Sequence, residues 1–230
     1  MLHKTRGIVL NYIKYRETSI IVKIFTELFG LNSYIVNGVR SAKAKNKIAL
    51  YQPLTILDLV VYHKKNTGLN RISEIKCSEP LMDIPINIKK SSIALFITDL
   101  LNKTIKENDE NVELFEFLYQ SVLVLEHLQH HYENFHLQFI LKLSRYLGFS
   151  PVSAQELINE LNAHVSHQSL TDQEMEILNE LIDAGYKNDI HLSNEFRRVL
   201  LHKLILFYKL HVDFPGEIKS LTVLHEVLND

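Results

Sequence analysis

The sequence has few of the residues on which covalent catalysis and nucleotide-binding turns depend. Its single cysteine, Cys77, permits no internal disulfide and no zinc site built from several thiolates. Seven glycines in 230 residues leave little material for a glycine-rich phosphate loop. The motifs G-x-x-x-x-G-K-[ST], G-x-S-x-G and H-E-x-x-H are all absent. We therefore expect a protein that is not an enzyme and that carries no cofactor or metal.

Long hydrophobic runs are also missing. The longest, such as residues 122–125, are far too short to cross a bilayer, and the N-terminal residues contain no apolar signal core. There is no block of like charge and no tract rich in Pro, Ser or Gly. A hydrophobic content of 46% is enough for a packed core. These features predict a globular intracellular protein without membrane contact.

Charge is divided unequally along the chain. Residues 1–80 carry 13 Lys and Arg against 5 Asp and Glu, a formal charge of +8, whereas residues 81–230 carry 12 against 22, a formal −10. The two parts combine to the net −2 of the whole chain. The first part would attract a polyanion, and the second would repel one. We therefore expect a basic module and an acidic module with different partners.

Residues 1–80 have the pattern of a small β-domain. Five short runs rich in Ile, Val, Leu, Thr and Tyr are separated by glycine and proline breakers. The runs are residues 5–10, 20–26, 33–36, 54–62 and 69–75. Several are apolar on both faces, which suits a closed barrel. Five strands in roughly 75 residues predict an OB-fold barrel, with an SH3-like barrel as the alternative.

From residue 81 onward the apolar period changes from two to 3.6, which predicts an all-α domain over residues 81–230. Ser153 and Thr171 each stand three residues before a Glu, the pattern of a capping box that opens a helix. Residues 75–90, with two prolines, are expected to form the linker. Other helices are expected at residues 91–105, 112–131, 135–147, 193–211 and 217–228. The fold class is therefore α+β, with a β-barrel followed by a helical domain.

The basic side chains of the first module gather in its connections. A nucleic-acid groove needs this arrangement, because flexible cations meet phosphates while rings between them stack on bases. The alternative is that the cations solvate exposed loops and the rings fill the barrel core. The predicted DNA-binding residues are Lys4, Arg6, Lys14, Arg16, Lys23, Tyr34, Arg40, Lys43, Lys45, Lys47, Lys64, Lys65 and Arg71. Tyr12, Tyr15, Phe29 and Tyr51 are further candidate rings.

Two histidine clusters raise the alternative of a metal site. They are His127, His130 and His131 near one helix end, and His164 with His167. Zinc sites use such spacings, but neither cluster has cysteine partners or an obvious remote ligand. An exposed helical face is the favoured interpretation. A metal-dependent hydrolase stays open as an alternative that would require a tightly bound, stoichiometric metal.

Taken in order, these segments resemble the RecO family of bacterial recombination mediators. The resemblance covers the whole first module and is thinner in the second, where Leu147-Gly148-Phe149 is similar to the end of the family's central helix. Residues 218–220 are similar to its C-terminal helix, although Leu221 stands where the family has arginine. The matching segments of the first module are residues 4–10 (KTRGIVL), 15–19 (YRETS), 25–31 (FTELFGL), 38–41 (GVRS), 50–54 (LYQPL) and 68–74 (GLNRISE).

The resemblance implies a role in DNA repair that involves no covalent chemistry. RecO-like proteins bind single- and double-stranded DNA and anneal complementary strands. They dock on the C-terminal tail of single-stranded DNA-binding protein and, with RecR, help load a recombinase. A cytoplasmic, nucleoid-associated protein is implied. Many members carry two Cys-x-x-Cys pairs after the Leu-Gly-aromatic step, but residues 150–171 hold no cysteine, so no zinc finger is expected here.

The resemblance also implies a pocket for that acidic, apolar tail. Its chemistry should be a basic island beside exposed apolar residues. The candidates are Lys142 and Arg145 near Tyr146, or Arg197 and Arg198 with Lys203; pairing of these cations with nearby acids is the alternative. Two other functions stay open. The barrel could contact a protein and serve as an interaction scaffold, or it could bind RNA, because OB-folds accept both nucleic acids.

Overall fold

The structure, a computed structural model, describes residues 1–41, 44, 47–63, 68–107, 109–165, 168–186, 189–213 and 216–228. The chain forms two compact units, Met1–Ile86 with Thr98–Leu123, and Asn87–Ile97 with Val124–Asp230. The sequence predicted a boundary after residue 80. The first unit also includes the end of one helix and most of the next, because side chains such as Phe115 pack on the barrel residue Phe25 at 6.3 Å between ring centroids.

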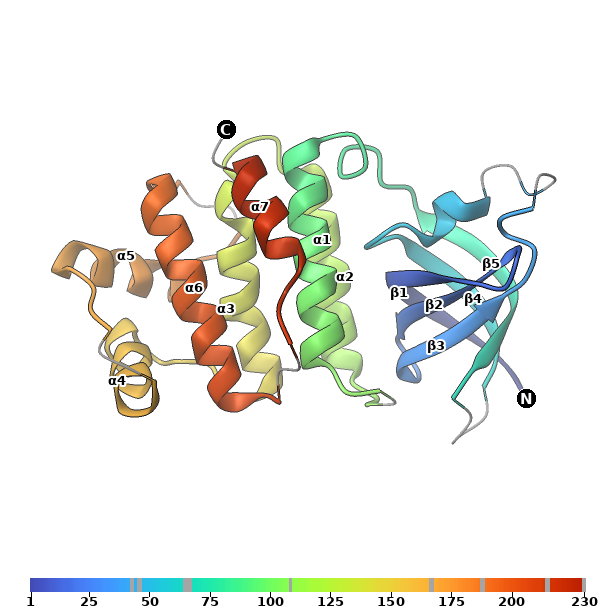
Figure 1. Ribbon diagram of the computed structural model, residues 1–230, viewed down its shortest axis with the longest axis horizontal. Helices are drawn as coiled ribbons and strands as arrows, with labels where there is room; N and C mark the ends of the chain where they lie inside the picture. Colours follow the sequence, from blue (N-terminus) through green and yellow to red (C-terminus); the bar gives the residue numbers. More distant parts are fainter. Residues whose placement is uncertain are drawn as a thin grey trace. The chain divides into compact units, whose positions relative to one another are not determined.

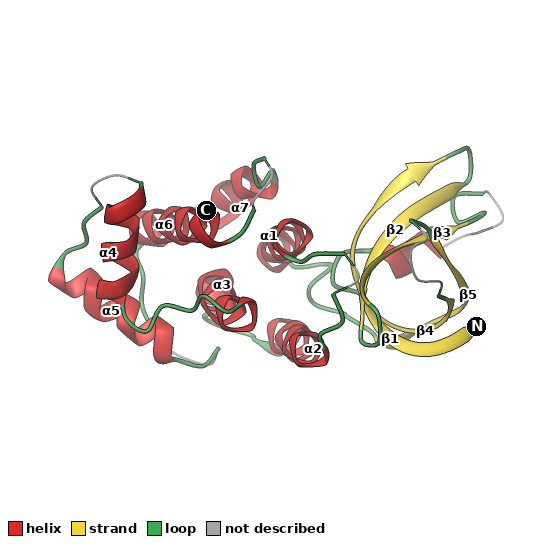
Figure 2. Cartoon of the chain, turned by 90° about the horizontal axis from the view of Figure 1, so that it is seen from below, coloured by secondary structure: helices red, strands yellow, loops and turns green. Residues whose placement is uncertain are grey.

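A closed five-stranded barrel forms the core of the first unit (Figures 1 and 2). Its strands are β1 (Leu2–Tyr15), β2 (Ser19–Thr26), β3 (Gly30–Val36), β4 (Ile56–Tyr62) and β5 (Asn70–Glu79). They pair in the order β1-β2-β3-β5-β4, and β3 runs parallel to β5. The predicted five-stranded OB-fold barrel is confirmed.

The long strand β1 closes the barrel by serving two partners. Residues 2–8 pair with β4, and residues 7–15 pair with β2. The register shifts between Val9 and Asn11, and such a bulge lets a strand bend from one sheet to another. Gly7 lies at this crossing, where a Cβ atom would come within 2.7 Å of Ile24 and 2.8 Å of Leu59. Only glycine allows the strands to approach this closely.

Apolar side chains fill the barrel interior. Its inward side chains alternate with outward ones along each strand, as the period of two requires. The 3-10 helix η1 (Lys47–Tyr51) contributes Tyr51 to this core. The buried cluster comprises Val9, Ile20, Val22, Ile24, Tyr34, Val39, Tyr51, Leu57, Leu59 and Val61.

The rest of the described chain is helical, which confirms the predicted all-α second part. Ser153 and Thr171 accept hydrogen bonds from the backbone N–H three residues later, and Thr171 completes the predicted capping box with Glu174. The elements are α1 (Ile88–Thr104), α2 (Val112–His127), η2 (Tyr132–Asn134), α3 (Phe135–Leu147), α4 (Ala154–His164), α5 (Asp172–Asp183), α6 (Asn194–His211) and α7 (Ser220–Leu228).

Several predicted boundaries were wrong by a few residues. The expected linker, residues 75–90, contains the end of β5 and the beginning of α1. β5 continues because its polar residues face outward while the backbone still pairs with β4. α2 ends at His127, four residues earlier than expected, and His131 then adopts a left-handed conformation with φ 59°.

The connection between α1 and α2 packs on the barrel within the first unit. Leu31 and Glu107 form a parallel bridge, and Gly30 faces the backbone of Asp109. Gly30 has φ +63°, and a Cβ atom there would lie 2.6 Å from the carbonyl carbon of Asp109. This turn therefore requires glycine both for its backbone conformation and for the contact.

Candidate nucleic-acid interface

The barrel carries most of its positive charge on one part of its surface. This part, the meander side, comprises the described residues within 11–25, 31–55 and 63–71, which form β2, β3, the second half of β1, the start of β5 and parts of the adjoining connections. Its described cations are Lys14, Arg16, Lys23, Arg40, Lys47 and Arg71, and its described acid is Glu17. The other barrel residues carry Lys4, Arg6 and Lys76 against Glu27, Asp58, Glu74 and Glu79. A polyanion would therefore be drawn to the meander side.

Arg40 joins two basic connections of the meander side. Its backbone N–H donates to Thr18 O at 2.9 Å, and its guanidinium donates to Arg16 O at 3.2 Å. The loop after β3 is thereby held against the β1–β2 turn. The Arg16 guanidinium lies over the Tyr15 ring, 5.2 Å from its centroid. Cations from two segments thus lie at one end of the barrel.

Three other cations of the meander side are exposed, so their side chains can contact a phosphate. The side chains of Lys14, Lys47 and Arg71 make no hydrogen bond or ion pair with any residue that the structure describes. Lys23 is half-buried, and its Nζ lies 3.1 Å from Glu107 Oε1, so its charge is already partly neutralised. The predicted residues Lys43, Lys45, Lys64 and Lys65 lie outside the described part of the chain.

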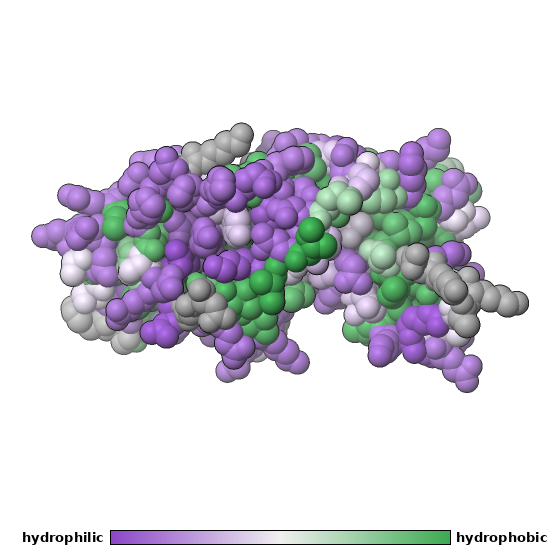
Figure 3. Space-filling view, turned by 90° about the horizontal axis from the view of Figure 1, so that it is seen from above, coloured by the Kyte–Doolittle hydropathy of each residue, from purple (hydrophilic) through white to green (hydrophobic). Residues whose placement is uncertain are grey.

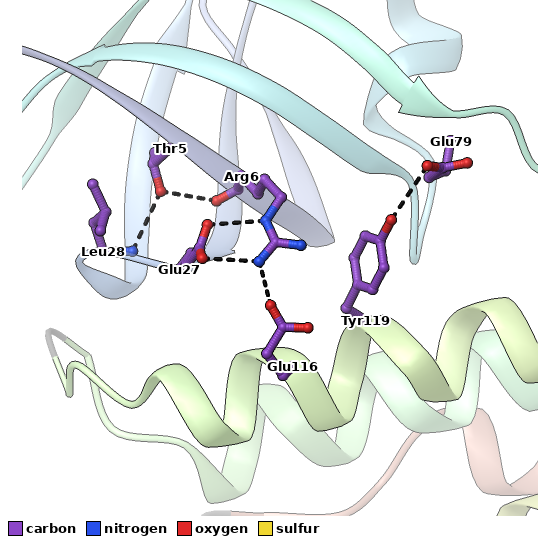
Figure 4. Close-up of polar contacts among 7 residues, drawn as sticks. All are labelled: Thr5, Arg6, Glu27, Leu28, Glu79, Glu116 and Tyr119. Carbon is purple, nitrogen blue, oxygen red and sulfur yellow. Dashed lines mark hydrogen bonds and ion pairs between the residues drawn. The ribbon is translucent and has the colours of Figure 1, made fainter.

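Arg6, also predicted to bind DNA, is engaged within the first unit (Figure 4). Its Nε and Nη2 donate to the two carboxylate oxygens of Glu27 at 3.0 and 2.8 Å, and Nη2 also contacts Glu116 on α2. Its guanidinium lies 5.0 Å from the Phe115 ring centroid and 5.1 Å from that of Tyr119. The hydrogen bond from Arg6 lowers the pKa of Glu27. Arg6 therefore fastens α2 to the barrel.

The surface around Arg6 is a groove of about 500 Å³ with mixed charge. Lys4, the remaining predicted cation of this part, lines it, together with Lys76 and the carboxylates of Asp58 and Glu74. Because three cations and three carboxylates line this groove, it offers a polyanion no net attraction. The Tyr119 hydroxyl donates to Glu79 at 3.2 Å beside it, as Figure 4 shows.

The prediction that Tyr34 stacks on bases was wrong. Its side chain is 0% exposed and belongs to the barrel core, and burial raises its pKa to about 12. Tyr51 is likewise a core residue, and Tyr12 and Phe29 are partly buried against the core. Sequence reasoning overlooked Tyr62, whose side chain is 49% exposed at the end of β4. The alternation of outward residues Asp58, Val60 and Tyr62 could have revealed it.

In the second unit, Lys142 and Arg145 of α3 have internal partners. Lys142 Nζ donates to Ala184 O at 2.8 Å, and Arg145 donates to Ile182 O at 3.0 Å. Gln138, on the same helix face, donates to Gly185 O at 3.2 Å. These donors satisfy carbonyl groups left at the C-terminal end of α5. Burial lowers the pKa of Lys142. Helix capping thus accounts for both cations.

Of the three predicted cations of α6, two have internal partners and one is exposed. Arg197 donates to Asn134 Oδ1, Asn194 Oδ1 and Leu192 O, and Lys203 donates to Gln168 at 2.7 Å. Arg198 is exposed, and its side chain makes no hydrogen bond or ion pair with the described residues. It lines a shallow crevice together with Arg197, Leu201, Leu224, His225 and Leu228.

Three histidines of the second unit, His130, His131 and His191, form ring contacts with one another. His131 lies near His130 and His191, with 6.5 and 5.9 Å between ring centroids, and its Nε2 is 3.7 Å from Asp189. Within the described part of the chain, no three His, Cys, Asp or Glu side chains are arranged to hold a metal ion. His167 lies outside that part.

No helix among the described residues is long and apolar enough to span a membrane.

Comparison with known proteins assigns both halves of the chain to one family. The family model "Recombination protein O N terminal" matches residues 1–81, and "Recombination protein O C terminal" matches residues 86–221. The chain is 37% identical to the DNA repair protein RecO of Flavobacterium johnsoniae, over 98% of this chain and 99% of that protein. It is 38% identical to its counterpart in Bacteroides fragilis, over the full length of both, and 34% identical to that of Phocaeicola vulgatus. The chain therefore belongs to the RecO family of recombination mediators in DNA repair.

Proposed function

We propose that this protein binds single- and double-stranded DNA on the meander side of its barrel and anneals complementary strands. With RecR, it would help load a recombinase onto DNA coated by single-stranded DNA-binding protein. The chemistry is non-covalent, because neutralising the phosphates of two strands lowers their repulsion and lets them pair. Family membership and the barrel's charge distribution support this proposal.

The observation that carries the proposal is the charge imbalance of the meander side. Among the described residues, six cations stand against one acid there, whereas the other cations of the barrel are balanced by carboxylates. The side chains of Lys14, Lys47 and Arg71 have no partner among the described residues. DNA phosphates could therefore bind these side chains by displacing water only, without breaking an existing ion pair.

The experiment compares two sets of alanine substitutions. One protein carries Lys14→Ala, Lys47→Ala and Arg71→Ala; the control carries Lys4→Ala and Lys76→Ala, two exposed cations outside the meander side. Each lost phosphate contact reduces the salt slope of log K by about 0.7 for single strands and about 0.9 for duplex. We expect the triple variant to lose about two units of slope on single-stranded DNA, and the control to lose little.

A uniform loss in both proteins would contradict the proposal, because it would mean that total charge matters and not its position. Both proteins should keep the wild-type unfolding temperature, since all five side chains are exposed. RNA of matched sequence and length, added as competitor, tests whether the same surface prefers RNA.

We further propose that the acidic tail of single-stranded DNA-binding protein docks at the crevice beside Arg198. Arg197 and Arg198 adjoin three leucines there, which matches a peptide that is both acidic and apolar. Arg198→Ala should weaken binding of a labelled tail peptide about tenfold. The exposed Lys209→Ala on the same helix should leave it unchanged. Equal binding by both variants would exclude the crevice.

A further inference from the structure

The outward side chains of the barrel form a continuous row across all five strands. The strand register pairs Leu2 with Tyr62, and Tyr62 with Arg71. It continues by pairing Arg71 with Ile35, Ile35 with Ile21, and Ile21 with Ile13. Directly paired residues project on the same face of a sheet. We name these six residues, Leu2, Tyr62, Arg71, Ile35, Ile21 and Ile13, the outer belt.

The outer belt is unusual because it is apolar and exposed. Ile13 is 60% exposed, and Leu2 and Tyr62 are each 49% exposed. Ile21 and Ile35 are half-buried, and Arg71 is exposed. The solvated face of an antiparallel sheet normally carries polar side chains. Figure 3 shows apolar surface over the barrel part of the chain, beside hydrophilic side chains.

The charged residues beside the outer belt indicate the chemistry of its ligand. The belt itself contains Arg71, and Lys14 follows Ile13 directly. Apolar side chains bordered by cations complement a ligand with apolar faces on an anionic backbone. Single-stranded DNA has this chemistry, whereas a duplex keeps the faces of its bases stacked inside.

We propose that the outer belt holds the bases of single-stranded DNA, with Tyr62 stacking on one base, and that this contact distinguishes single strands from duplex. Leu2 and Arg71, which pair with Tyr62 on either side, would contact the adjoining base and the backbone, and Ile13, at the other end of the belt, would contact a base further along the strand. The cations of the meander side would serve both forms of DNA equally, because both present phosphates. This inference rests on the DNA binding proposed above.

The test measures fluorescence anisotropy of a labelled oligo(dT) strand and of a labelled duplex of equal length, at one salt concentration. Tyr62→Ala should weaken binding of the single strand about tenfold and change duplex binding less than twofold. Tyr62→Phe keeps the ring and should retain the affinity for single strands. Ile86→Ser is the control for loss of an exposed apolar side chain, since Ile86 is 81% exposed and outside the outer belt.

Equal losses on single strand and duplex would overturn the inference, because the outer belt would then not contact bases. Unchanged binding of both would overturn it too and would leave the belt free for a protein partner. If the wild-type protein bound neither form, the proposed function itself would fail. Ile13→Tyr gives an independent check that removes nothing from the core. It should raise affinity for the single strand at least threefold and leave the duplex unchanged, and no gain would contradict the proposal.

Discussion

Gly30 gives a stringent test of the contact between the barrel and the α1–α2 connection. Gly30 and Gly38 both adopt positive φ angles, +63° and +71°, so alanine at either position meets the same backbone strain. That strain costs about 1–2 kcal/mol. A Cβ atom at Gly38 meets nothing within 4 Å, whereas at Gly30 it would lie 2.6 Å from the carbonyl carbon of Asp109. Overpacking of this kind adds about 1–3 kcal/mol.

We therefore expect Gly30→Ala to destabilise the protein by about 2–5 kcal/mol and Gly38→Ala by about 1–2 kcal/mol. The measurement is urea unfolding of both variants, followed by circular dichroism. The difference between the two variants isolates the collision with Asp109, because the conformational cost is shared. Equal destabilisation would refute the reasoning and would mean that the connection does not rest on this turn in solution.

Further predictions concern buried polar side chains of the second unit. Burial lowers the pKa of His136 from 6.5 to about 3, so the folded protein binds this proton more weakly than the unfolded chain. Its contribution to stability is complete above pH 6.5 and falls with decreasing pH, by about 2 kcal/mol at pH 5. His136→Phe should reduce the loss of stability between pH 7 and pH 5 by that amount. The measurement is the urea unfolding midpoint of both proteins at the two pH values. An equal fall in midpoint for wild type and variant would contradict the assignment. Lys90 is 0% exposed, and its Nζ donates to Glu126 O at 2.8 Å near the end of α2. Lys90→Met should cost about 1–3 kcal/mol, because the carbonyl loses its donor; unchanged thermal unfolding would show that the bond contributes nothing net.

The strands of the barrel could be predicted from sequence because β-branched runs and breakers mark them directly. Their ends were less predictable. β5 continues through Glu79 on backbone pairing with β4, which no local pattern specifies. The closing role of β1 depends on a bulge near Val9, and the sequence contains no signal for it.

Assignment of individual site residues was harder, because a side chain's role depends on elements distant in sequence. The sequence predicted Tyr34 to be a base-stacking ring, but its register in β3 points its side chain into the barrel. Lys142 and Arg145 resembled a docking site, but they cap α5, about 40 residues away along the chain. The division of charge between the two modules, by contrast, needed only composition.

The central claim, that the meander side binds DNA, is tested most directly by titrating labelled single-stranded DNA with the wild-type protein at several salt concentrations. Engagement of four to six cations predicts saturable binding with a slope of log K against log salt of about −3 to −4. Absence of binding at low salt, or a slope near zero, would contradict the account.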